Sequence, residues 1–129
     1  MTPLESEIRR RIAAAGPMPL GQYMSLCLTD PQHGCYVTRD PLGRSGDFTT
    51  APEVSQMFGE LIGLWIVSVW QQMGSPDNIR VVELGPGRGT MMNDAMRAAK
   101  IVPAFVKAAV LHFVEISPVL QAVQEQTVS

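Results

Sequence analysis

Three glycines at alternate positions follow an acid in Val81-Val82-Glu83-Leu84-Gly85-Pro86-Gly87-Arg88-Gly89-Thr90, and this run constrains the fold more than any other stretch. The β-branched residues before Glu83 favour a strand, and the Met- and Ala-rich residues after Thr90 favour a helix. Glycine permits a positive φ and carries no Cβ, so the turn exposes backbone N–H groups to a ligand at the positive end of the helix dipole. The run predicts strand, tight turn and helix around a nucleotide-like ligand.

The spacing of the glycines decides between ligand classes. A dinucleotide fingerprint has glycine at positions one, three and six, but the sixth residue counted from Gly85 is Thr90. A P-loop is excluded because no Lys-Ser or Lys-Thr pair follows the glycines. A second acid, Glu115, ends the next strand-like run, Val110-Leu111-His112-Phe113-Val114. This arrangement resembles the first two cofactor motifs of class I S-adenosylmethionine (SAM) methyltransferases.

The resemblance implies a role for each acid. Glu83 supports the glycine loop and the methionine end of the cofactor, and Glu115 accepts hydrogen bonds from both ribose hydroxyls. A carboxylate suits the second task because it offers two acceptor oxygens to two neighbouring donors. Two other interpretations stay open: a tight turn without a ligand, and an NAD-dependent dehydrogenase, which also holds its ribose with an acid.

Composition excludes several classes of protein. Ten basic and twelve acidic side chains give a net charge of −2, without a basic patch typical of nucleic-acid binding. We interpret Arg9-Arg10-Arg11 as a solvated helix face. Cys27 and Cys35 lack metal-ligand spacing, so we expect no metal and two reduced thiols. The apolar run from Leu61 to Trp70 is too short to span a membrane, and no signal peptide is visible, so we expect a cytoplasmic protein.

Periodicity predicts helices around two strands. Helices are expected over 3–15, over 20–28, from Thr50 to Gly74, from Met91 to Pro103 and from Pro118 onward, and strands over 80–84 and 109–115. We expect an α/β fold: the N-terminal part of a Rossmann-like class I methyltransferase sheet, preceded by a small helical cap, in a truncated chain. Residues 1–45 are assigned to the cap and a binding loop, and residues 46–129 to the first part of the methyltransferase domain.

The entry to the third helix combines a cap with unexplained polar residues. Thr50 and Glu53 fit a capping box, in which each side chain bonds the other residue's backbone N–H. The helix is apolar nearly all round in its second half, so we expect it against the sheet and under the N-terminal cap. The cap does not account for the polar residues Asp47, Thr49, Ser55 and Gln56.

Three motifs in register resemble the MidA family of SAM-dependent methyltransferases. They are Asp30-Pro31-x-x-Gly34-Cys35-Tyr36, the run from Gly46 to Glu60, and Glu83-Leu84-Gly85-Pro86-Gly87-Arg88-Gly89-Thr90. The resemblance implies a class I methyltransferase whose eukaryotic members are mitochondrial, assist assembly of respiratory complex I and methylate a protein arginine. It places the cofactor between the following residues: Glu83, Gly85, Gly87, Gly89, Thr90, Glu115, Gly46 and Thr49.

The resemblance also implies that residues around Pro52 close over the cofactor and the methyl acceptor. Pro52, Ser55 and Gln56 are the expected substrate-loop residues. A guanidinium is charged at neutral pH, so a carboxylate must hold it and help its proton leave; Glu53 and Asp47 are the candidates. The expected partner is a protein substrate, for example a subunit of a respiratory complex. The alternatives are a non-catalytic SAM-binding assembly factor and a small-molecule methyltransferase.

Overall fold

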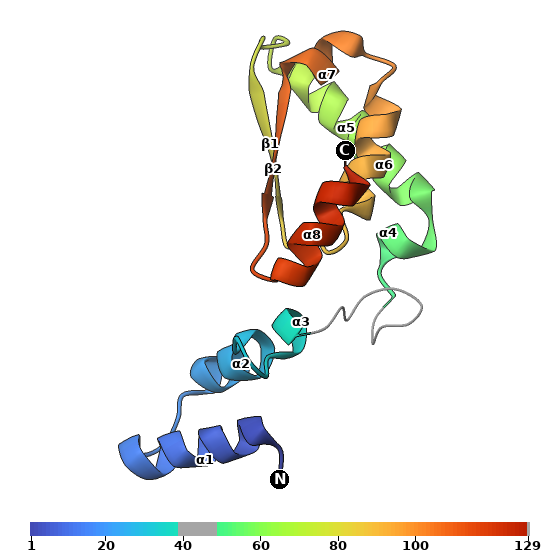
Figure 1. Ribbon diagram of the computed structural model, residues 1–129. Coiled ribbons are helices and arrows are strands. Elements are labelled where there is room, and N and C mark those ends of the chain that lie inside the picture. The colour runs from blue at the N-terminus through green and yellow to red at the C-terminus, as the bar shows by residue number, and fades with distance from the viewer. Residues whose placement is uncertain (39–48, 129) are drawn as a thin grey trace.

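Two parallel strands and the helices packed on one side of them form the larger part of the structure (Figure 1). The computed structural model describes residues 1–38 and 49–128. Its elements run in the following order: α1 (Pro3–Ala15), α2 (Leu20–Thr29), α3 (Cys35–Thr38), α4 (Ala51–Val54), α5 (Gln56–Gln72), β1 (Ile79–Leu84), α6 (Thr90–Ala99), α7 (Pro103–Ala108), β2 (Ala109–Val114) and α8 (Pro118–Thr127). The expected strands and the helices at both ends of the chain are therefore present, within one or two residues of their predicted bounds.

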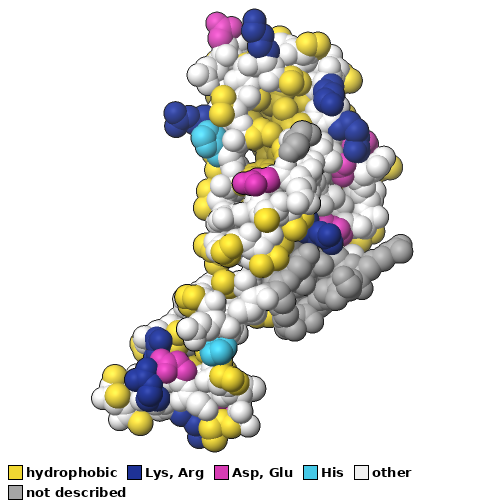
Figure 2. Space-filling model, viewed as in Figure 1, with side chains coloured by type: hydrophobic (Ala, Val, Ile, Leu, Met, Phe, Trp, Pro, Cys, Tyr) yellow, Lys and Arg dark blue, Asp and Glu magenta, His cyan; other side chains and the backbone are white. Residues whose placement is uncertain are grey.

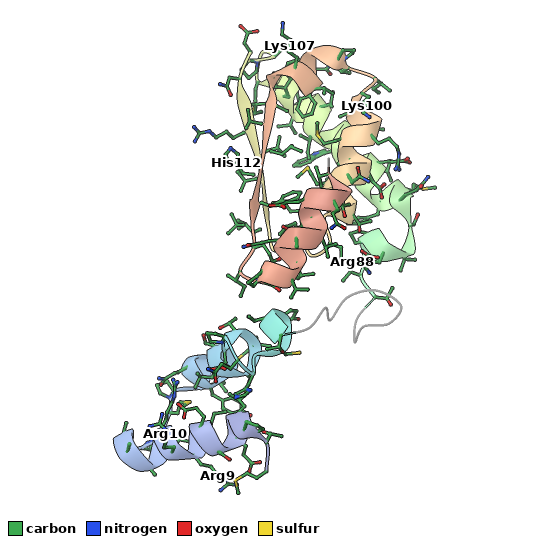
Figure 3. All side chains as sticks on the ribbon, viewed as in Figure 1. Arg9, Arg10, Arg88, Lys100, Lys107 and His112 are labelled. Atoms are coloured by element: carbon green, nitrogen blue, oxygen red, sulfur yellow. The ribbon has the colours of Figure 1, made fainter. Side chains whose placement is uncertain are left out.

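The two strands pair in parallel, as the sequence predicted, with Ile79 opposite Ala109 and Leu84 opposite Val114. Burial alternates along both strands, because successive side chains of a strand point to opposite faces. Helices α5 to α8 lie on one side of the sheet, and His112 points away from them on the other (Figures 1 and 3). The carboxyl ends of both strands therefore meet at one edge, where Glu83 and Glu115 lie.

The core lies between the sheet and helices α5, α6 and α7. Its buried residues are Val67, Trp70, Ala99, Phe105 and Ala108. The rings of Trp70 and Phe105 meet edge to face, with centroids 5.6 Å apart at 69°, a geometry that aromatic quadrupoles favour. The Trp70 indole donates to the Pro76 carbonyl at 2.9 Å, so its polar N–H is satisfied on burial.

Helices α5 and α6 approach each other closely because two glycines of α5 face α6. A Cβ on Gly59 would lie 2.7 Å from Asp94 Cβ, and one on Gly63 would lie 2.6 Å from Ala95 Cα. Both distances are too short for a carbon atom. The pattern Gly-x-x-x-Gly places these residues on one helix face, a signal in the sequence that was missed.

The predicted surroundings of α5 are confirmed for the sheet, with which Val67 and Trp70 share the core, but wrong for the N-terminal cap. The helix buries only one stripe, Gly59, Gly63, Val67 and Trp70, and packs mainly on α6, while Leu61 and Trp65 are 59% and 63% exposed. The N-terminal helices instead form their own group, which touches the rest of the chain through α3 and the start of α8 (Figure 1).

Two predicted helix boundaries also differ from the structure. The helix entering at Thr50 is broken, because Ser55 is extended (φ −152°, ψ 125°) and caps α5 by accepting from the Met57 N–H at 3.3 Å. Pro103 begins α7 and does not end α6, since proline fits the first helical turn, where its missing N–H has no partner anyway. The segment 1–45, assigned to a cap and a binding loop, also contains the short helix α3, and residues 39–48 lie outside the described part.

The basic run on α1 is a solvated face, as predicted. Arg9 pairs with Glu5 at 2.9 Å, and both Arg10 and Arg11 pair with Glu7. Hydrogen bonds from Arg10 and Arg11 lower the pKa of Glu7 to about 2. On the face shown in Figure 2, Lys and Arg side chains are spread over both ends of the molecule.

Cys27 and Cys35 form no disulfide in the described ranges. No helix of the described residues is both long and apolar enough to cross a membrane.

Replacing Gly63 by alanine will destabilise the full-length protein, because the new methyl group collides with the backbone of α6. We expect a loss of roughly 1–3 kcal/mol in the free energy of unfolding, typical of overpacking, measured by thermal or denaturant unfolding. Gly21→Ala is the matched control: a Cβ on Gly21 in helix α2 meets nothing within 4 Å, so stability stays equal or rises slightly. Equal stability of Gly63→Ala and native protein would contradict the close contact.

Candidate functional site

A cavity of about 470 Å³ opens where the carboxyl ends of β1 and β2 meet helices α4, α6 and α8. Three acids, two glycines, a proline and a threonine that the sequence singled out line it together: Glu53, Glu83, Glu115, Gly85, Gly87, Pro52 and Thr90. They come from segments up to 63 positions apart in the sequence (Pro52 to Glu115). The parallel pairing brings Glu83 and Glu115 to one side, as expected for a ligand at the carboxyl ends of parallel strands.

The glycine corner has the backbone that the sequence predicted. Gly85, Gly87 and Gly89 have φ of 63°, 58° and 80°, in the left-handed region that other residues rarely adopt. Gly89 is the N-cap of α6 and provides no side-chain cap. Its Cβ position lies 3.3 Å from Val128 Cγ2, so this glycine also allows α8 to pack close to the corner.

One carboxylate oxygen of Glu83 is buried and unsatisfied among the described residues. Its Oε2 atom makes no hydrogen bond to any residue that the structure describes. Burial raises the pKa of Glu83, since desolvation disfavours the charged form. Buried polar atoms are nearly always paired, so this oxygen marks a place where a donor or a cation would be stabilised.

Glu115 is held in a fixed orientation by the start of α8. Its Oε1 accepts from the backbone N–H groups of Ile116 and Ser117, both at 2.8 Å. Those two bonds use the acceptor capacity of Oε1, whereas Oε2 has one long contact, at 3.4 Å, with Gln124 Nε2. In this conformation Glu115 therefore offers a ligand one oxygen, not the two that were expected from the sequence.

The predicted capping box is wrong. Thr50 is the N-cap of α4, but its side chain makes no capping bond there, and the Glu53 N–H bonds the Thr50 carbonyl at 2.9 Å. The Glu53 carboxylate turns instead to the glycine corner, where Thr90 Oγ1 donates to Glu53 Oε1 at 2.8 Å. The Glu53 carboxylate has two possible partners, the Thr50 N–H of the predicted capping box and the Thr90 hydroxyl. Because α5 packs on α6, Thr90 lies within reach and forms the bond.

Other predicted residues lie away from the cavity or outside the description. Thr49 is exposed, Ser55 caps α5, and Gln56 is the exposed first residue of that helix. None of these three lines the cavity. Gly46 and Asp47 lie outside the described residues, so their predicted roles stay predictions.

Several residues that line the cavity or contact its glycine corner were missed. Tyr36 lines the cavity from α3 and belongs to a motif whose side chains were given no role. Arg88 lies within the glycine run, and Figure 3 shows it beside α4. Met91 also lines the cavity, whereas the neighbouring Met92 is buried in the core, with 2% of its surface exposed. Gln124 is buried on α8 and bonds the corner; no pattern in the sequence marked it.

In the described ranges, no group of three or more His, Cys, Asp or Glu side chains gathers to hold a metal ion. Among the residues that the structure describes, the cavity is lined by three carboxylates, Glu53, Glu83 and Glu115, beside one guanidinium, Arg88. Such a lining favours a ligand with positive charge and hydrogen-bond donors.

Comparisons with known proteins agree with this geometry. A family model described as "Putative S-adenosyl-L-methionine-dependent methyltransferase" matches residues 61–129. The chain is 48% identical over 125 residues to the mitochondrial protein arginine methyltransferase NDUFAF7 homolog of Drosophila melanogaster, covering 95% of this chain and 28% of that protein. It is 40% identical over 131 residues to the human mitochondrial protein arginine methyltransferase NDUFAF7, covering all of this chain and 30% of that protein.

A solved structure is similar throughout. The crystal structure of a protein from Burkholderia thailandensis bound to S-adenosyl-homocysteine matches with a TM-score of 0.80 and 27% identity, over 97% of this chain and 33% of that one. This similarity confirms the predicted Rossmann-like fold. The chain spans under a third of the length of the Drosophila and human relatives.

Replacing Glu83 by glutamine will stabilise the ligand-free full-length protein at neutral pH. Its folded pKa is raised, so its contribution to stability is present below the unfolded value, about 4.3, and is lost as pH rises through the folded pKa. We expect Tm of the Glu83→Gln variant to exceed the native Tm by roughly 1–3 °C at pH 7, and the difference to shrink at pH 4. Asp77→Asn, at an exposed position, is the control; a lower Tm for Glu83→Gln than for native protein at pH 7 would contradict this account.

Proposed function

The chain belongs to the MidA-like family of SAM-dependent methyltransferases, and from this premise we propose that it forms the cofactor-binding part of a protein arginine methyltransferase. One observation carries the proposal: Glu83, near the end of β1, and Glu115, directly after the parallel strand β2, line one cavity with a corner of positive-φ glycines. Bound SAM would supply a methyl group on a sulfonium centre.

The residues present fit this cofactor. The Glu83 Oε2 atom, buried without a partner among the described residues, would accept from the ammonium of the methionine end, and its negative charge would favour the nearby cationic sulfonium. Glu115 would receive the ribose hydroxyls through Oε2, because Oε1 is already bonded to two backbone N–H groups. A Cβ on Gly85 would meet nothing within 4 Å, so this residue leaves room for a ligand. Gly87 also lines the cavity, and Gly89 and Thr90 start the helix behind it.

The segment leading into α5 carries the remaining predicted contacts. Gly46 and Thr49 are proposed to add further contacts to the cofactor. Pro52 lines the cavity, and Ser55 and Gln56 sit at the break between α4 and α5. We propose that this segment contacts the methyl acceptor.

Glu53 is the residue of the cavity best suited to hold a guanidinium. Thr90 fixes one of its carboxylate oxygens at 2.8 Å, which sets the orientation of the whole side chain. The carboxylate would align the guanidinium nitrogen with the methyl donor and accept a proton as methylation proceeds. Asp47 is the second candidate for this role.

The names of the relatives, which are mitochondrial protein arginine methyltransferases, support the proposed acceptor; the proposed setting comes from the family resemblance. The proposed acceptor is a protein arginine, and the proposed setting is assembly of respiratory complex I, with a cytoplasmic location for this chain and the mitochondrial matrix for its eukaryotic relatives. We also propose that residues 1–45 form a helical cap with a binding loop, and that residues 46–129 begin the methyltransferase domain. Arginine as the acceptor distinguishes this proposal from a small-molecule methyltransferase.

Titration of the full-length protein with SAM and with NADH tests the cofactor. We expect calorimetric binding of SAM and no heat with NADH; the reverse result would identify a dehydrogenase. Incubation with SAM, followed by mass spectrometry of co-purifying proteins, should reveal methyl-arginine. SAM binding without methyl transfer to any protein would favour a non-catalytic assembly factor.

Two substitutions at Glu53 separate its charge from its hydrogen bond with Thr90. Glu53→Gln keeps an oxygen that can accept from Thr90 but removes the negative charge and the proton acceptor. We therefore expect kcat to fall roughly 100-fold or more, as for loss of a general base, with Tm nearly unchanged. Glu53→Ala should lose activity to a similar extent and also lower Tm.

Glu60→Gln is the matched control, because Glu60 is an acid of α5 that pairs with Arg97 at 2.8 Å and does not line the cavity. The kcat of Glu60→Gln should stay within about twofold of native, because Glu60 does not line the cavity. The variant should still fold, because exposed ion pairs contribute little to stability. Full methyl transfer by Glu53→Gln together with a lower Tm for Glu53→Ala would assign Glu53 a structural role only.

A further inference from the structure

A buried glutamine of α8 joins the two halves of the cavity. Gln124 is 4% exposed, and its Nε2 donates to the Gly87 carbonyl at 2.6 Å. The same nitrogen lies 3.4 Å from Glu115 Oε2. One side-chain amide therefore contacts the glycine corner after β1 and the carboxylate after β2.

The contact with Gly87 controls a peptide plane of the corner. The carbonyl of Gly87 and the N–H of Arg88 point in opposite directions, because the peptide bond between them is planar and trans. Holding the carbonyl toward α8 therefore turns the Arg88 N–H away from α8. Because Gly87 tolerates many backbone conformations, such a plane is easily rotated unless a partner fixes it.

The contact with Glu115 acts on the one oxygen that remains for a ligand. Ile116 and Ser117 bond Oε1, whereas the Gln124 amide contacts Oε2. A neutral donor keeps Oε2 in place without neutralising its charge, which a lysine or arginine would do. The amide thus orients the Glu115 carboxylate, which stays negatively charged and can accept a hydrogen bond from the ligand.

We propose that Gln124 is a positioning residue for SAM binding: it sets the Gly87–Arg88 peptide plane and the Glu115 carboxylate at the same time. This inference rests on the proposed function and adds to it a residue that touches no reacting atom. A purely structural alternative exists, since Gln124 Cγ also lies 3.6 Å from the Cβ position of Gly89 and so packs α8 on the corner.

Two near-isosteric variants of the full-length protein separate positioning from packing. Gln124→Met fills a similar volume but has no N–H donor. Gln124→Glu has the same shape but places a carboxylate oxygen against the Gly87 carbonyl and the Glu115 carboxylate, which are both acceptors. Gln121→Met is the matched control, because Gln121 lies on the same helix and donates to the Glu115 backbone carbonyl at 2.7 Å but reaches neither Gly87 nor the carboxylate.

The measurements are Kd for S-adenosyl-homocysteine by calorimetry, KM for SAM, kcat and Tm. We expect Kd and KM to rise about tenfold in Gln124→Met, equivalent to about 1.4 kcal/mol, and further in Gln124→Glu. We expect kcat at saturating SAM to stay within about twofold of native, because the lost interaction affects binding of the ground state and the transition state equally. Gln121→Met should leave Kd within about twofold of native.

If Gln124 only packs α8 on the glycine corner, both Gln124 variants will have a lower Tm and an unchanged Kd for S-adenosyl-homocysteine. That result would overturn the inference. An equal rise of Kd in Gln121→Met would overturn it too, since any loosening of α8 would then suffice. If Gln124→Met does not fold, the comparison is made with the isosteric Gln124→Glu. Native protein that binds no S-adenosyl-homocysteine would overturn both this inference and the proposed function, whereas normal binding by native and variant proteins would overturn this inference alone.

Discussion

The close contact of α5 with α6 is the constraint on which the cavity depends. Because Gly59 and Gly63 carry no side chain, the two helices approach until the Cβ positions of these glycines would overlap Asp94 and Ala95. Arg97 of α6, paired with Glu60 of α5 at 2.8 Å, adds a polar contact to the same interface. The N-terminal ends of both helices therefore lie near one another, and α4 carries Glu53 to Thr90.

The glycine corner is then held from both sides by side chains distant in sequence. Glu53 bonds Thr90 from α4, and Gln124 bonds Gly87 from α8. A corner of three positive-φ glycines has many accessible backbone conformations when unfolded, so fixing it costs conformational entropy. The two bonds offset part of that cost and leave the corner preorganised. The buried oxygen of Glu83 has the opposite effect, since it raises the free energy of the ligand-free protein and so favours a cationic ligand.

Prediction succeeded where the controlling interactions are local or periodic, and failed where distant segments compete. The β-branched residues Val81 and Val82 before Glu83, and the glycines after it, indicated a strand and its turn. Parallel pairing then brought Glu83 and Glu115 to one edge. The capping box failed because Glu53 has two possible partners, and only the folded chain shows that Thr90 lies within reach. The prediction that the N-terminal cap covers α5 failed, because an apolar helix surface indicates burial but does not identify the segment that buries it.

By itself the sequence determined the order of strands and helices, the positive-φ corner and the family to which the chain belongs, since these follow from residue type and short-range spacing. Only the tertiary structure decided where Glu53 points and that Gln124 reaches both the Gly87 carbonyl and the Glu115 carboxylate. These are properties of side chains separated by nine to 37 positions. Their distances are set by helix packing, and no local pattern encodes them.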